Sequence, residues 1–103
     1  MTSGEADLPR VVTAAADEAA SWDTRAGSLS DLSDADLLAA RDALIRLVDR
    51  LEGLLAAAEA ASPLDEELIG VAARALRTAR HNEVWAGYVL HQRLPPTDLA
   101  DLI

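Results

Sequence analysis

Two long segments of the chain carry apolar residues at helical spacing, and a short junction separates them. The first runs from Leu32 to Ala61 and the second from Leu64 to Leu94, with Ser62-Pro63 between them. Apolar residues that recur every three or four positions form one face of an amphipathic helix. Because the junction is so short, the second helix must reverse direction. The pattern therefore predicts an antiparallel helical hairpin.

A third amphipathic segment precedes the hairpin. Asp7 can cap this helix, and Pro9 falls in its first turn, where the missing N–H costs nothing. Its apolar residues form one stripe at i, i+3, i+4, i+7, i+8, i+11 and i+14, namely Leu8, Val11, Val12, Ala15, Ala16, Ala19 and Trp22.

Capping residues suggest where the hairpin helices begin. Ser33 can cap the second helix, with Asp36 at its third position, and Ser62 can cap the third, with Pro63 as its first residue. No run of β-branched or aromatic residues alternates with polar ones, so no strand is expected. After a disordered tail over residues 1–6, the sequence predicts one all-α domain at 7–103, with helices at about 8–23, 33–61 and 63–94 and a short terminal turn at 98–103.

The charge balance limits the expected partners. The formal net charge is −9, from 18 acidic and 9 basic residues, and every basic residue is Arg. An acidic surface repels phosphate backbones and anionic lipids, so neither nucleic acid nor a membrane is expected as a partner. The chain has no cysteine, no secretory signal pattern and no long apolar run, which favours a cytoplasmic location. Abundant Ala and Arg without Lys is a composition typical of high-GC bacterial genomes.

The position of the turn predicts how the hairpin helices align. If the reversal centres near residue 63, facing positions have numbers that add to roughly 126. This register predicts ion pairs from Glu52 to Arg74 and from Asp49 to Arg77. It also sets three mid-helix glycines opposite alanines, which predicts close backbone approach at Gly53, Gly70 and Gly87.

A polar cluster on the third helix is a candidate pocket. Glu83 falls on the apolar face of that helix, and the predicted register offers Arg41 as its partner. One interpretation is a partly buried structural ion pair. The other is a ligand pocket between the second and third helices, with Arg41, Asn82 and Glu83 in its wall and Trp85 beside them.

A stripe of large polar and aromatic side chains follows the outer face of the third helix. In one interpretation the first helix covers this stripe, with Trp22 or Val12 packed on Trp85. In the other the stripe binds a protein partner, because Trp, Tyr and Arg are enriched at interface hot spots. Its members recur at helical spacing and are Arg74, Arg77, His81, Trp85, Tyr88 and Gln92.

No residue pattern points to catalysis, a metal or another cofactor. His81 and His91 are nearly three turns apart on one helix, and no Glu-x-x-His or His-x-x-x-His spacing occurs. Ser and Thr gather at expected helix caps or in the tail, where capping accounts for them. We therefore expect a protein that is not an enzyme and that binds no cofactor.

These observations favour a small protein–protein interaction module, such as a regulatory adaptor, an antitoxin-like subunit or an accessory subunit of a bacterial complex. Apolar surface left over after hairpin closure predicts a homodimer, a four-helix bundle with Val84, Tyr88 and Leu90 near its interface. Two alternatives stay open. The protein could bind a small molecule in the pocket described above, or it could act as an acidic decoy of a nucleic-acid-binding protein.

Overall fold

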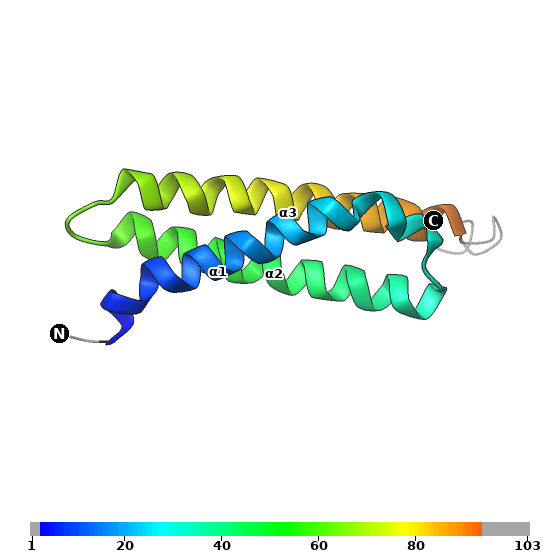
Figure 1. The fold of residues 1–103 in the computed structure, drawn as a ribbon, viewed down its shortest axis with the longest axis horizontal. Coiled ribbons are helices and arrows are strands. Elements are labelled where there is room, and N and C mark those ends of the chain that lie inside the picture. The colour runs from blue at the N-terminus through cyan, green and yellow to red at the C-terminus, as the bar shows by residue number, and fades with distance from the viewer. Residues whose placement is uncertain (1–2, 94–103) are drawn as a thin grey trace, which may run out of the picture.

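The computed structural model describes residues 3–93, and this part of the chain is helical nearly throughout. Its elements are α1 (Ser3–Arg25), the short 3₁₀ helix η1 (Ala26–Asp31), α2 (Asp34–Ala60) and α3 (Glu66–Arg93). α2 and α3 run antiparallel side by side, and α1 crosses one face of this pair at an angle (Figure 1). The predicted all-α fold and its antiparallel hairpin are confirmed, and the described residues contain no strand.

The hairpin helices begin at caps, one of which differs from the prediction. Ser33 caps α2 as expected, since its hydroxyl accepts a hydrogen bond from the Asp36 amide at 3.2 Å. The expected cap of α3 at Ser62 is wrong. Asp65 takes this role, and its carboxylate accepts from the Leu68 amide at 3.1 Å. Aspartate caps as well as serine, and its charge also suits the positive end of the helix dipole, so α3 starts three residues later than predicted.

The first helix is longer than predicted. α1 begins at Ser3 instead of near residue 8, so residues 3–6, expected as a disordered tail, are helical. The expected cap Asp7 and the expected first-turn residue Pro9 therefore both lie inside α1, which is a correction to the prediction. Because proline has no N–H, the helix lacks one intrahelical hydrogen bond at Pro9. α1 ends at Arg25, and η1 then connects it to α2. The terminal turn expected at 98–103 lies outside the described residues.

The core is built from leucines of α2 and alanines of α3. Four leucines of α2 are fully buried: Leu37, Leu44, Leu47 and Leu51. Ala72, Ala79 and Ala86 of α3 are buried to the same extent. Small side chains let the helix backbones approach, while the leucines fill the space between them. α1 adds a similar stripe with Val12, Ala15, Ala19 and Trp22.

One end of the bundle is closed by η1 and by the last turn of α3. Leu29 of η1 is buried, with 2% of its surface exposed. The Arg93 guanidinium donates to the Ser30 carbonyl at 2.8 Å and to the Asp34 carboxylate at 2.9 Å. Arg93 therefore ties the end of α3 to η1 and to the start of α2.

The predicted ion pairs across the hairpin are wrong. Glu52 pairs with Arg80 at 2.8 Å, not with Arg74. Arg74 instead donates to the Gly70 carbonyl of its own helix at 3.4 Å. Among the described residues, neither Asp49 nor Arg77 has an ion-pair partner. Because α3 starts only at Glu66, the connection is longer than the register assumed.

The predicted close approach at the glycines is also wrong. A Cβ atom built on Gly53 or Gly70 would meet nothing within 4 Å. On Gly87 it would meet only the Nε atom of Arg41, at 3.6 Å, which is an ordinary contact. These glycines leave open space beside the helices, and no neighbouring backbone fills it.

A candidate docking surface on α3

The six residues of the predicted stripe all lie exposed on one side of α3. At 100° per residue they fall within an arc of about 80° around the helix axis. Val84 lies at the edge of the same arc and exposes 67% of its surface. We call this set the outer surface of α3, and it comprises Arg74, Arg77, His81, Val84, Trp85, Tyr88 and Gln92.

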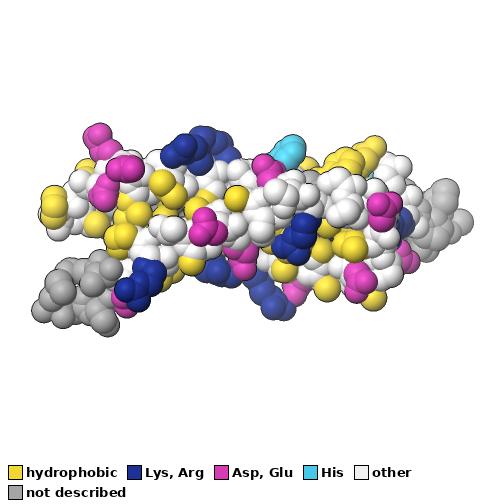
Figure 2. Space-filling model, viewed as in Figure 1, with side chains coloured by type: hydrophobic (Ala, Val, Ile, Leu, Met, Phe, Trp, Pro, Cys, Tyr) yellow, Lys and Arg dark blue, Asp and Glu magenta, His cyan; other side chains and the backbone are white. Residues whose placement is uncertain are grey.

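The aromatic residues of the outer surface are partly exposed and stack on each other. Trp85 exposes 36% of its surface and Tyr88 54%. Their ring centroids lie 5.6 Å apart, with an angle of 17° between the ring planes. Exposed tyrosine, tryptophan and arginine side chains are typical of protein-binding surfaces. Figure 2 shows basic, histidine and hydrophobic side chains following one another along the α3 edge of the molecule.

α1 lies beside Arg74 but does not bury the outer surface, so the interpretation in which the first helix covers the whole stripe is wrong. Its own apolar side chains Val12 and Trp22 are 0% and 7% exposed. α1 packs instead against the side of α3 that carries Ala75 and Asn82. None of the six residues of the predicted stripe is buried.

Leu90, which was expected with Val84 and Tyr88 near a dimer interface, lies on a different side of α3 from them. Its side chain is partly buried and packs against the core. Helical spacing explains this difference, since Leu90 lies about 160° around the axis from Tyr88. Val84 and Tyr88, which were expected near the same interface, are exposed.

The outer surface carries a local charge opposite to that of the whole protein. It contains Arg74 and Arg77 and no acid, a formal charge of +2, whereas the chain totals −9. α2 contains six acids and three Arg, a formal charge of −3. A basic strip on an acidic protein can attract an acidic partner and orient it.

The predicted pocket between the second and third helices is not present in the described residues. Arg41 is exposed, Glu83 is partly exposed, and no ion pair joins them among the residues described. Asn82 is fully buried and points away from this site. Its amide nitrogen donates to the Asp23 carboxylate of α1 at 3.2 Å and to the Thr78 carbonyl at 3.0 Å. The neighbours Asn82 and Glu83 lie 100° apart on the helix, so one faces α1 and the other does not.

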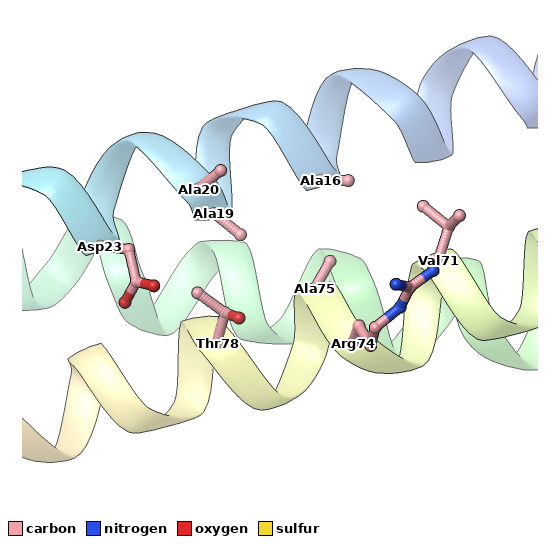
Figure 3. Close-up of a pocket in the computed structure, with 8 residues that line it drawn as sticks. All are labelled: Ala16, Ala19, Ala20, Asp23, Val71, Arg74, Ala75 and Thr78. Atoms are coloured by element: carbon pink, nitrogen blue, oxygen red, sulfur yellow. The ribbon is translucent and has the colours of Figure 1, made fainter.

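A shallow hollow lies elsewhere, between α1 and α3 (Figure 3). Its volume is about 240 Å³, below the roughly 300–1,000 Å³ of typical ligand pockets. Asp23, Arg74 and Thr78 are its polar members, and the other lining residues are Ala16, Ala19, Ala20, Val71 and Ala75. Sequence reasoning missed this hollow because it depends on how small alanines meet across two helices.

Residues 3–93 contain neither a cluster of metal ligands nor a membrane-spanning helix. No three His, Asp or Glu side chains gather closely enough there to hold a metal ion. None of the described helices combines the length and apolar character needed to cross a membrane.

Comparison with protein-family models, curated proteins and solved structures gives no match to this chain. Its function must therefore be inferred from its own surfaces.

Proposed function

We propose that the protein is a non-enzymatic interaction module that docks another protein through the outer surface of α3. The observation that carries this proposal is the exposure of Val84, Trp85 and Tyr88 beside Arg77 and His81 on one helix face. These apolar side chains are in contact with water. A partner that covered them would gain about 25 cal/mol of binding free energy for each Å² of apolar surface removed from water. A regulatory adaptor, an antitoxin-like subunit or an accessory subunit of a bacterial cytoplasmic complex would use such a surface.

The two alternatives have less support. A small-molecule role needs an enclosed site, and the hollow between α1 and α3 is small. A decoy role needs the acids of the N-terminal third on one open surface. Several of these acids instead bind within the protein: Glu18 to Arg50, Asp23 to Asn82 and Asp34 to Arg93.

Affinity purification from the native host tests the docking proposal. A tagged triple variant, Arg77→Ala/Val84→Ala/Tyr88→Ala, should lose the protein that co-purifies with the parent chain. The matched control is Arg10→Ala/Val11→Ala, which removes exposed side chains of the same kinds from α1. The proposal would be wrong if the triple variant retained the partner, or if the control lost it equally.

A further inference from the structure

The α2–α3 hairpin has one face that α1 covers and one that it does not. Arg50 of α2 reaches Glu18 of α1 at 3.3 Å, and Asn82 of α3 also binds α1. Glu52 and Arg80 lie about 160° or more around their helices from these positions, and they join α2 to α3 at 2.8 Å. The Glu52–Arg80 pair therefore marks the face opposite α1, which no described element covers (Figure 1).

Exposed apolar side chains from both helices lie on this open face. Leu38 of α2 exposes 55% of its surface, and Ile45, on the same side, is partly exposed. Val84 and Tyr88 of α3 expose 67% and 54%. Leu38, Ile45 and Val84 fall within about 40° of the Glu52 or Arg80 direction, whereas Tyr88 lies about 80° around α3 from Arg80. α2 and α3 therefore both expose apolar side chains on this face.

Among the described residues, the same face carries unpaired charges on both helices, Arg41 and Asp49 on α2 and Arg77 on α3. Asp49 of α2 and Arg77 of α3 are exposed, and neither has an ion-pair partner within residues 3–93. Asp49 lies about 20° around α2 from Leu38, and Arg77 lies about 20° around α3 from Val84. Both side chains therefore project away from the hairpin instead of toward each other.

We propose that the side of the outer surface formed by Arg77, Val84 and Tyr88 docks a second copy of this chain, whose α2 lies along α3. This inference rests on the proposed function, because it names the partner of that same surface. It commits to a symmetric four-helix bundle built from two hairpins, with the α1 helices on the outside.

Charge selects the arrangement of the two copies. With a two-fold axis parallel to the helices, α2 of each copy faces α3 of the other, so a helix with a charge of −3 meets a helix with a charge of +1. With the axis perpendicular to the helices, α3 would face α3 and α2 would face α2. Juxtaposed like charges are unfavourable, so the parallel axis is favoured.

The register of the hairpin then sets apolar residues opposite apolar residues, and an acid opposite an arginine, across the proposed interface. Arg41 lies beside Gly87, so positions whose numbers add to about 128 share one level along the bundle. A parallel two-fold axis preserves this level in the second copy. Ile45 then meets Val84 of the second copy, Leu38 meets its Tyr88, and Asp49 meets its Arg77, each within about two residues, or 3 Å, of rise.

Charge reversal with sedimentation equilibrium tests this inference. The parent chain should sediment at twice its mass of 10.9 kDa at micromolar concentrations. Arg77→Glu and Asp49→Arg should each raise the dimer dissociation constant at least tenfold, because each sets like charges against each other twice per dimer. The double variant Arg77→Glu/Asp49→Arg should restore the parent constant, since every pair is again opposite in sign.

The control is Arg10→Glu, which makes the same charge change as Arg77→Glu on the exposed side of α1. It should leave the dissociation constant unchanged. All three substituted positions are exposed, and circular dichroism will verify that each variant keeps its helix content.

The outcomes separate this inference from the proposed function. A parent chain that stays at 10.9 kDa overturns the second copy as partner, while the purification experiment still decides whether α3 docks another protein. A dimer that ignores both single reversals places its interface elsewhere and contradicts this arrangement. Single variants that weaken the dimer without rescue by the double variant contradict the contact between Asp49 and Arg77.

Discussion

Replacing two glycines by alanine should stabilise this protein. Gly53 lies in the middle of α2 and Gly70 in the first half of α3, and an added Cβ would meet nothing within 4 Å at either position. Alanine is favoured over glycine inside a helix by about 0.8–1.0 kcal/mol. With no contact to oppose this gain, Gly53→Ala and Gly70→Ala should each raise the free energy of unfolding by about 1 kcal/mol. For a domain near this size, that corresponds to a Tm increase of roughly 4–8 °C.

Urea and thermal unfolding followed by far-UV circular dichroism measure the effect. The matched control is Ala56→Gly, which makes the reverse change at an exposed position of α2 and should cost about 1 kcal/mol. The opposite sign would refute the reasoning. If Gly53→Ala or Gly70→Ala lowered the stability by 1 kcal/mol or more, the helix backbones would have to approach closely at these glycines, as the register derived from the sequence alone predicts.

Three further expectations concern the cap, the core and the ion pair of the hairpin. Asp65→Ala should lower the free energy of unfolding, measured by chemical denaturation, by about 0.5–2 kcal/mol because it removes the α3 cap. Ser62→Ala should change it by no more than about 0.5 kcal/mol. Equal effects of the two substitutions would indicate that Ser62 also caps α3. Leu44→Ala should lower the free energy of unfolding by about 2–5 kcal/mol because Leu44 is fully buried, and Leu64→Ala, at an exposed site in the connection, should lower it much less in the same assay. Glu52→Gln should lower the free energy of unfolding by at most about 1 kcal/mol, and this loss should become smaller as salt is added. A larger loss that does not depend on salt would contradict a surface ion pair.

The helical fold could be predicted because apolar periodicity is a local signal. The spacing around Leu44 and Leu47 identifies the buried face of α2 without knowledge of any other helix. The Ser33 cap was also predictable, since the side chain and the amide that it accepts from lie within one turn. The start of α3 was not, because Ser62 and Asp65 are both good caps and only the geometry of the connection chooses between them.

Features that depend on how helices meet could not be predicted from the sequence. A shift of a few residues in the connection moved the partner of Glu52 from Arg74 to Arg80. Leu29 belongs to the core because η1 directs its side chain inward. The local sequence indicates only a turn at this point, so the burial of Leu29 could not be predicted. Asn82 was assigned to a pocket, yet it is buried against α1, and within the described residues its Oδ1 atom has no hydrogen-bond partner.

The candidate docking surface was also predictable in part, from helical spacing but not from the packing of the helices. The exposed stripe on α3 was predictable, because helical spacing alone gathers Arg77, His81 and Tyr88 on one side. Its position relative to α1 was not, since the sequence allowed the first helix to cover it. The open face opposite α1 emerged only from the arrangement of the three helices (Figure 1).

Site-specific photo-crosslinking shows whether a protein docks on the outer surface of α3. A benzophenone side chain introduced at position 88, in place of the half-exposed Tyr88, should form an adduct on irradiation in cells of the native host. The same side chain at position 10 on α1, in place of exposed Arg10, serves as the control and should form none. A covalent adduct from position 88 alone is the predicted result, and a mass of two chains would identify a second copy as the partner. No adduct from position 88, or equal adducts from positions 88 and 10, would contradict the account.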